Sequence, residues 1–249
     1  MGIMSDQPIR LFAPAKLTTS LRVVGTRADG YHLIDAEMVT LDVGDTLELT
    51  ESDSTSVTYV GLEGDRLDVG ENDLVARALG LCRRSAHVRV TKAIAAGAGL
   101  GGGSSDAAAV LYWAGMTDLG QAVTLGADVA FCLHGGRANV RGIGEVVEPL
   151  PFEEKVFTLM TPPIMCSTPL VYRAWDELGA PRGDNGNDLE PAALVVAPEL
   201  ARWRDELAET CSQRPRLAGS GSTWFVEGAF PGEGRVVTRT IPGRPPITS

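Results

Sequence analysis

The sequence has few of the side chains that usually bind metals or form disulfides. Its 249 residues include three histidines and four cysteines, and none of the cysteines has Cys-x-x-Cys spacing. This scarcity disfavours a zinc cluster, so no side chain is predicted as a metal ligand. Scattered cysteines are typical of reduced thiols, which favours a cytoplasmic protein. The cysteines are Cys82, Cys132, Cys166 and Cys211.

The sequence also lacks an excess of basic residues and any long apolar run. Lysine and arginine number 22 against 32 aspartates and glutamates, and the net charge of −10 disfavours nucleic-acid or anionic-membrane binding. The first ten residues contain no apolar core of a signal peptide, and no apolar run approaches membrane-spanning length. We therefore expect neither a nucleic acid nor a membrane as a partner.

What the sequence does contain is glycine, concentrated in one stretch. Five of the seven residues from Gly97 to Gly103 are glycines. Valines alternate in residues 87–92, which predicts a strand, and the alanine-rich residues 107–113 predict a helix. The chain is therefore expected to form a strand, a glycine-rich loop and a helix in succession. The candidate caps of this helix are Ser104, Ser105 and Asp106.

A glycine-rich loop that leads into a helix is suited to phosphate binding. Glycine lets a ligand approach the main chain closely, and the free N–H groups of the helix start favour an anion. The alternative is a turn without a ligand. A Walker loop is excluded because no lysine follows the glycines. The dinucleotide spacing is satisfied by Gly97, Gly99 and Gly102, but the loop lies behind a strand-rich segment rather than in an opening βαβ unit, which disfavours a Rossmann domain.

The rest of the chain predicts an α+β protein of one large or two small domains. Expected strands are two short ones in 11–24, a strand–turn–strand over 38–49 with the turn at 43–45, then 56–60, a hairpin in 135–147, and 155–160. Expected helices are 73–84, 119–133 with a turn at 126–128, 170–178 and 198–209. A boundary is expected at Pro162-Pro163, a second loop of small residues at 219–222, and a loose tail after Pro242.

Four polar residues are candidates for chemistry, each with a plainer alternative. Lys16 lies in an apolar stretch, where a lysine can simply extend its ammonium to solvent. Asp128 follows Gly126-Ala127, where an acid can cap a helix or form a partly buried catalytic carboxylate. A lysine and a carboxylate together suit phosphoryl transfer. Tyr31 and His32 follow a turn and can either begin a strand or contact a planar base.

Six motifs occur in an order that resembles the GHMP kinases, the small-molecule kinases named for galactose, homoserine, mevalonate and phosphomevalonate. The motifs are Ala13-Pro14-Ala15-Lys16, Asp29-Gly30-Tyr31-His32, the stretch 99–108, Gly126-Ala127-Asp128-Val129-Ala130-Phe131, Asn187-Asp188-Leu189-Glu190 and Gly219-Ser220-Gly221-Ser222-Thr223. The resemblance covers residues 10–225. It implies a GHMP kinase fold, with an N-terminal domain (1–162) like the second domain of ribosomal protein S5 and a ferredoxin-like C-terminal domain (163–249).

The resemblance also implies a reaction and the residues that perform it. ATP and Mg²⁺ are the expected cofactors, and the Asp29–His32 motif resembles those members that phosphorylate the 2-hydroxyl of a cytidine diphosphate-linked methylerythritol for non-mevalonate isoprenoid synthesis. The implied catalytic residues are Asp128, as base or orienting group, and Lys16. The implied substrate-binding residues are Thr18, Tyr31, His32 and Asp128. The implied ATP-binding residues are Asp73, Lys92, Ala95, Ala96, Gly97, Ala98, Gly99, Leu100, Gly101, Gly102, Gly103, Ser104 and Ser105.

The sequence departs from the family pattern at several positions. Asp73 and Thr18 replace asparagines, Ala95 replaces a proline, and the segments 113–126 and 209–216 are short. Two alternatives therefore stay open. One is a GHMP kinase for another small alcohol, such as homoserine or a mevalonate derivative. The other is a degenerate nucleotide-binding protein without catalysis.

Overall fold

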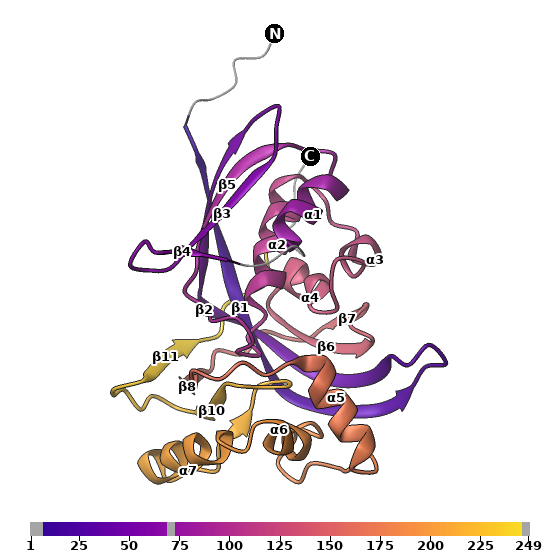
Figure 1. Ribbon diagram of the computed structural model, residues 1–249, viewed down its shortest axis with the longest axis vertical. Coiled ribbons are helices and arrows are strands. Elements are labelled where there is room, and N and C mark those ends of the chain that lie inside the picture. The colour runs from indigo at the N-terminus through magenta and orange to yellow at the C-terminus, as the bar shows by residue number, and fades with distance from the viewer. Residues whose placement is uncertain (1–6, 69–72, 246–249) are drawn as a thin grey trace.

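The structure, a computed structural model, describes residues 7–68 and 73–245. Within these residues a seven-stranded sheet has the order β4-β3-β5-β2-β6-β7, with β1 paired to β2 beside this path. It forms the upper half of Figure 1, and one end of the β1–β2 pair extends to the lower right. β3 and β5 are parallel, and the other neighbours are antiparallel. The strands of this first sheet are β1 (Ile9–Thr26), β2 (His32–Glu51), β3 (Ser56–Val60), β4 (Arg66–Leu67), β5 (Ala86–Thr91), β6 (Arg137–Gly142) and β7 (Val146–Pro149).

β1 and β2 are two long strands, each continuous. The expectations of two short strands in 11–24 and of a turn at 43–45 are wrong, because β1 and β2 pair antiparallel from end to end, with bulges in between. Gly44 lies opposite Pro14, and a Cβ there would lie 2.2 Å from the Ala13 carbonyl oxygen. Glycine at this position permits a close approach of the two strands rather than a turn.

Four helices cover one face of the first sheet (Figure 1). The core between them contains fully buried side chains such as Leu47, Leu79 and Leu111. The helix expected after the glycine-rich stretch is confirmed as α2, and the strand before it as β5. The helices are α1 (Leu74–Leu81), α2 (Gly102–Trp113), α3 (Leu119–Ala122) and α4 (Val129–His134).

A second sheet forms the lower half of the molecule, in the order β11-β8-β10-β9 (Figure 1). Its strands are β8 (Val156–Met160), β9 (Arg216–Leu217), β10 (Trp224–Glu227) and β11 (Arg235–Arg239). Its helices are α5 (Thr168–Glu177), α6 (Glu190–Val196) and α7 (Leu200–Cys211); the sequence analysis did not predict α6. Over residues 7–68 and 73–245, no helix combines the length and the apolar character needed to cross a bilayer.

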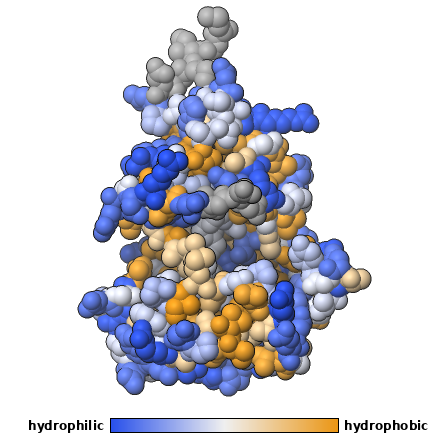
Figure 2. Space-filling view, in the orientation of Figure 1, coloured by the Kyte–Doolittle hydropathy of each residue, from blue (hydrophilic) through white to orange (hydrophobic). Residues whose placement is uncertain are grey.

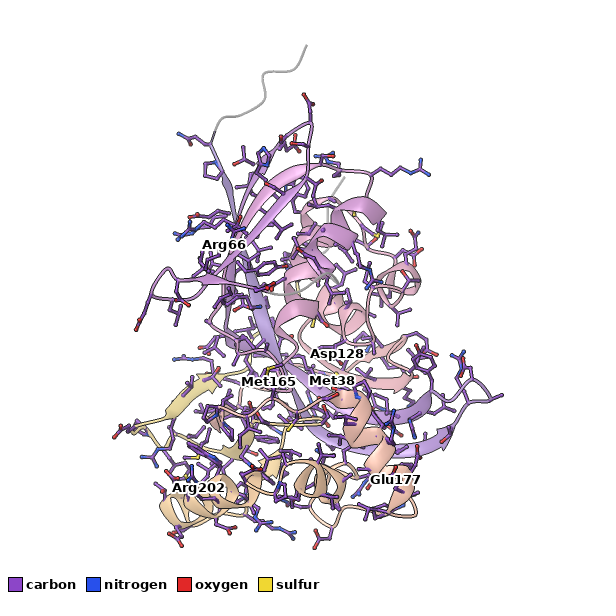
Figure 3. The ribbon with its side chains drawn as sticks, in the orientation of Figure 1. Met38, Arg66, Asp128, Met165, Glu177 and Arg202 are labelled. Carbon is purple, nitrogen blue, oxygen red and sulfur yellow. The ribbon has the colours of Figure 1, made fainter. Side chains whose placement is uncertain are left out.

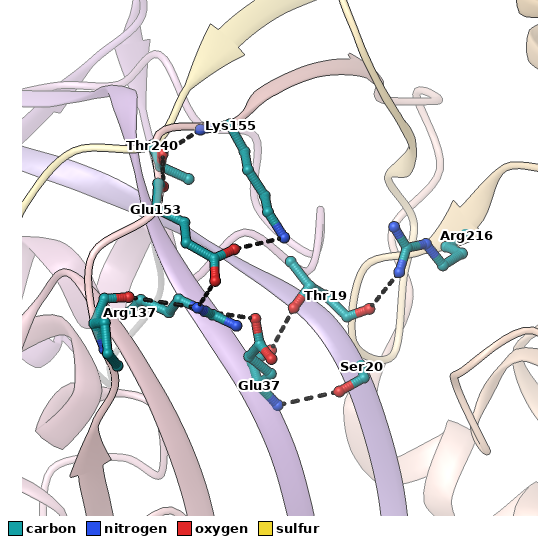
Figure 4. A network of polar contacts seen from close by, with 9 residues as sticks. Thr19, Ser20, Glu37, Arg137, Glu153, Lys155, Arg216 and Thr240 are labelled. Atoms are coloured by element: carbon teal, nitrogen blue, oxygen red, sulfur yellow. Dashed lines mark hydrogen bonds and ion pairs between the residues drawn. The ribbon is translucent and has the colours of Figure 1, made fainter.

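Polar contacts join the first sheet to the lower half (Figure 4). The Arg137 guanidinium on β6 pairs with Glu37 on β2 at 2.9 Å and also with Glu153. On the other side of this network, Arg216 donates from Nη1 to the carbonyl oxygen of Thr19 at 3.1 Å. These contacts fix the lower half against β1 and β2, the strands that carry Lys16 and His32.

The end of the described chain returns to the upper half. Ile241 N donates to the Thr40 carbonyl at 2.9 Å, and Arg244 N donates to the His134 carbonyl at 3.2 Å. The expectation of a loose tail after Pro242 is therefore wrong as far as Pro245. The partners lie about 110 to 200 positions earlier in the chain, where a local sequence pattern gives no sign of them.

Candidate functional site

A cleft of about 970 Å³ opens between the upper and lower halves. Figure 2 shows the surface hollowed at mid-height, with hydrophobic residues near it. The predicted site residues that line this cleft are Lys16, Thr18, Tyr31, His32, Asp73, Lys92, Ala95, Ala96, Gly97, Ala98, Gly99, Gly101, Gly102, Gly103, Ser104 and Asp128. Leu100 and Ser105 are buried beside them. The Ser105 hydroxyl donates to the Pro14 carbonyl at 2.6 Å, so its side chain points into the core.

The glycine-rich loop ends at a helix without a side-chain cap. Gly101, with φ of 69°, is the N-cap of α2, so the prediction of a cap from Ser104, Ser105 or Asp106 is wrong. The first bond of the helix runs from Ser105 N to the Gly101 carbonyl at 2.8 Å. The amides of the preceding helical residues point toward the cleft end of the helix, where they and the helix dipole favour a bound anion.

The second loop of small residues packs directly against the first. Ser222 N and Thr223 N donate to the carbonyls of Gly97 and Ala98, each at 3.1 Å. A Cβ on Gly99 would lie 2.3 Å from the carbonyl oxygen of the second loop's neighbour Ala218. Glycine at position 99 is therefore required by this close approach as well as by its φ of 78°. The second loop therefore helps to fix the conformation of the glycine-rich loop by bonding to it.

Lys16 and Asp128 meet in the cleft. The Lys16 ammonium lies 3.2 Å from Asp128 Oδ2 and donates to the Thr18 hydroxyl at 3.1 Å. The Lys16 side chain is 6% exposed, so it does not extend to solvent, whereas that of Asp128 is 32% exposed. Asp128 occupies the N-cap position of α4 without making a side-chain cap bond. Figure 3 shows Asp128 at mid-height, between the upper helices and α5.

Aromatic residues from both halves form one wall of the cleft. The His32 ring stacks on Tyr172 at 4.6 Å between centroids, and His32 Nε2 lies 2.9 Å from Asp176 Oδ1. Burial, with the negative charge of Asp128, raises the pKa of the Tyr172 hydroxyl above its ordinary value. Tyr31 is exposed at the cleft edge. Sequence analysis missed Tyr172 and Asp176, although their spacing of four places them on one helix face.

Lys92 lies between two buried carboxylates. Its ammonium is 2.6 Å from Asp106 Oδ2 and also pairs with Asp45 Oδ2. Burial opposes the charge of this lysine, but the negative charges of Asp106 and Asp45 raise its pKa above the ordinary value. Burial raises the pKa of Asp106 to about 7, against the opposing charge of Lys92. Asp45 was not among the predicted site residues.

Asp73 combines a place in the cleft with a structural role. It is the N-cap of α1, and its Oδ1 accepts from the amides of Val75 and Ala76 at 2.8 and 3.1 Å. The Tyr59 hydroxyl donates to the same oxygen at 2.8 Å. This oxygen is therefore held by protein donors, as expected for an N-cap aspartate.

The fold and this cleft define a GHMP kinase. Mevalonate kinase from Methanococcus jannaschii, a solved structure, is similar with a TM-score of 0.59 at 11% identity, covering 95% of this chain and 99% of that one. A crystal structure of 4-(cytidine 5'-diphospho)-2C-methyl-D-erythritol kinase has a TM-score of 0.73 at 28% identity, and the match covers 93% of this chain and 99% of that one. The predicted α+β GHMP kinase fold is confirmed.

Sequence similarity narrows the class to one family. No model of a known protein family matches the chain. The 4-diphosphocytidyl-2-C-methyl-D-erythritol kinase of Cereibacter sphaeroides is 35% identical over 242 residues, which cover 86% of this chain and 87% of that protein. The chain belongs to the 4-diphosphocytidyl-2-C-methyl-D-erythritol kinase family. It is thus a small-molecule kinase, and membership implies the use of ATP.

Proposed function

We propose that the chain transfers the γ-phosphate of ATP to the 2-hydroxyl of 4-diphosphocytidyl-2-C-methyl-D-erythritol, a step of non-mevalonate isoprenoid synthesis. The relative from Cereibacter sphaeroides and the crystal structure at a TM-score of 0.73 carry the name of this enzyme. The observation that carries the proposal is the Lys16–Asp128 pair at 3.2 Å, in the same cleft as the glycine-rich loop. A carboxylate beside a phosphate loop supplies the acid–base group that transfer to an alcohol requires.

In this proposal each residue of the pair has its own task. Asp128 accepts a hydrogen bond from the hydroxyl of the substrate. It thereby orients this hydroxyl or removes its proton. Lys16 steadies the negative charge on Asp128 and on the transferred phosphoryl group. Its main-chain amide bonds to the Leu100 carbonyl at 3.0 Å, which places the pair directly beside the loop. Thr18 receives a bond from the Lys16 ammonium and so holds the lysine in place.

The ATP phosphates would lie against the start of α2. The residues proposed to surround ATP are Asp73, Lys92, Ala95, Ala96, Gly97, Ala98, Gly99, Leu100, Gly101, Gly102, Gly103, Ser104 and Ser105. Support comes from the uncapped helix start and from the positive φ of Gly97, Gly99 and Gly101. Backbone amides supply most of the attraction, because the Lys92 ammonium is already paired with two carboxylates.

The residues near the loop fit a divalent metal ion. Asp106 Oδ1 is buried and has no hydrogen-bond partner among the described residues, and Ser104 lines the same cleft. Carboxylate and hydroxyl oxygens are ligands that Mg²⁺ accepts, usually together with phosphate oxygens and waters. We therefore propose that Asp106 and Ser104 would hold Mg²⁺ with ATP. With ATP bound, such an ion would supply positive charge that offsets the negative charge of the phosphates during transfer.

The cytidine end of the substrate would lie against the aromatic wall. His32 stacks on Tyr172 and is held by Asp176, and the exposed Tyr31 ring stands at the same edge. A planar ring held in this way offers a stacking surface for a base. A monomer or homodimer and a cytoplasmic location complete the proposal. All four cysteines are free thiols, which fits a reducing compartment.

The proposal is tested by ADP release from Mg·ATP with the purified protein. We expect stimulation by 4-diphosphocytidyl-2-C-methyl-D-erythritol and none by methylerythritol phosphate or homoserine. Equal stimulation by homoserine would favour a kinase for another alcohol. ATP binding without turnover on any of these alcohols would favour a degenerate nucleotide-binding protein.

A further inference from the structure

One buried cluster touches both ends of the glycine-rich loop. Asp45 comes from β2, Lys92 follows β5, and Asp106 lies in the second turn of α2. The Lys92 ammonium bonds to both carboxylates. Asp45 is fully buried and does not line the cleft, so it can contact neither the nucleotide nor the substrate directly.

Asp45 holds the chain where it enters the loop. Its Oδ1 accepts from the amides of Ala93 and Ile94 at 2.6 and 2.9 Å, directly before the expected phosphate ligands begin. The other oxygen, Oδ2, pairs with Lys92. Two charge-assisted bonds from successive amides fix the direction in which the chain leaves β5.

The same cluster holds the chain where it leaves the loop. Asp106 Oδ2 binds the Lys92 ammonium at 2.6 Å and thereby ties α2 to β5. A Cβ on Gly102 would lie 3.2 Å from Asp45 Oδ2, so the absence of a side chain there lets α2 begin close to this carboxylate. Lys92 also offsets two negative charges that would otherwise repel a phosphate nearby.

We infer that Asp45, Lys92 and Asp106 form a positioning triad for the glycine-rich loop, with Asp45 as the residue that fixes the loop's entry. The inference rests on the proposed function of this loop in binding ATP. Because Asp45 acts through the loop, its loss should weaken the fit to ATP rather than merely reduce the amount of folded enzyme. Small displacements of binding groups are enough to change affinity strongly.

The chain offers a matched control for this test. Asp188 is also buried, and it accepts from two amides, those of Val23 and Gly183, each at 3.0 Å. It also pairs with the Arg22 guanidinium at 2.6 Å. Its bonds tie β1 to the segment before α6 and do not touch the glycine-rich loop. Asp45→Asn and Asp188→Asn therefore remove the same kind of charge from the same kind of site.

The experiment compares ATP affinity by calorimetry, and KM for ATP, in the two variants. We expect Asp45→Asn to weaken ATP binding about tenfold or more while KM for the alcohol stays near the wild-type value. Asp188→Asn should leave ATP affinity within about twofold. Unchanged ATP affinity in folded Asp45→Asn would overturn the inference and leave the proposed kinase activity standing. Absence of ATP binding in the wild-type protein would instead overturn both.

Hydrogen exchange on the wild-type protein keeps the inference testable if Asp45→Asn does not fold. The amides of Ala93 and Ile94 are expected to exchange as slowly as the amide of Val90 in β5, because the Asp45 carboxylate holds them. Exchange of both amides at the rate of an open loop would contradict the inference.

Discussion

Lys16 and Lys92 have similar partners in very different surroundings. Lys16 meets one carboxylate, that of Asp128, whose side chain is 32% exposed to the cleft. Lys92 meets two, and the side chains of Asp45 and Asp106 are 0% and 1% exposed. A partly exposed pair can exchange its partner for a substrate, whereas a buried pair is too costly to open. The first pair is therefore suited to chemistry and the second to architecture.

The largest expected effect is the loss of activity when the Lys16–Asp128 pair is changed. Asp128→Asn keeps the shape of the side chain but removes its basicity, so we expect kcat to fall about 10²–10⁴-fold. Its effect on stability should be smaller than that of opening the Lys92 cluster, because Asp128 is 32% exposed and the asparagine oxygen can still accept a hydrogen bond from Lys16. The check is steady-state kinetics beside thermal unfolding, with the exposed Asp118→Asn as control. Turnover that survives unchanged in Asp128→Asn would remove this residue from the mechanism.

The second-largest effect is on the stability of the folded protein, to which the buried Lys92 cluster should contribute more than an exposed ion pair does. Lys92→Met leaves two buried carboxylates without a cation, and we expect the free energy of unfolding to fall by about 3–5 kcal/mol. Lys155→Met breaks a surface pair with Glu153 at 3.0 Å and should cost about 1 kcal/mol or less. Denaturant unfolding of the two variants measures the difference. An equal loss of unfolding free energy in the two variants would mean that the burial of the Lys92 cluster does not add to its contribution to stability.

A smaller effect concerns the contact between the two loops. Gly99→Ala forces a Cβ to within 2.3 Å of the Ala218 carbonyl oxygen, and we expect it to cost about 2–4 kcal/mol. Gly115 has nearly the same φ, 80° against 78°, with nothing within 4 Å of its Cβ position. Gly115→Ala should therefore cost about 1–2 kcal/mol, the backbone penalty alone. Thermal unfolding of the two variants measures the difference. Equal destabilisation would argue against tight packing between the glycine-rich loop and the loop at 219–222.

The smallest effect is a pH dependence. Burial raises the pKa of Asp106 to about 7, while an unfolded aspartate has a pKa of about 3.9. Between these values the folded state holds more protons than the unfolded state, so this group lowers stability as the pH rises from about 4 to about 7. Asp106→Asn removes that loss. Its stability relative to wild type should rise between pH 6 and pH 8, by about 1 kcal/mol. A pH-independent difference in denaturant unfolding would contradict the raised pKa.

The local parts of the fold could be predicted from the sequence. The strand β5, the glycine-rich loop and the helix α2 follow from valine alternation, glycine content and alanine content, which act over a few residues. The cap of α2 could not be predicted in the same way. Three polar residues looked suitable, but Gly101 already ends the loop in a left-handed conformation, so the helix begins before any of them.

The non-local parts could not be predicted. The continuity of β1 and β2 depends on their mutual pairing, and the turn signal at Gly44 instead marks a close approach to Ala13. Asp45 gave no motif signal because its partners Lys92 and Asp106 are far away in sequence. The structure places Lys16 beside Asp128, and the catalytic roles that the family resemblance implied for both residues stay predictions.

The most direct test of the account identifies the hydroxyl that receives the phosphate. Proton-coupled ³¹P NMR of the product distinguishes the three hydroxyls of the methylerythritol unit. Carbon 2 carries the methyl group and no hydrogen, so a phosphate on its hydroxyl gives a singlet. We predict a new phosphomonoester singlet that requires the wild-type protein and that Asp128→Asn produces at least about 10²-fold more slowly. A triplet or a doublet, from phosphate on the primary or the secondary hydroxyl, would contradict the account.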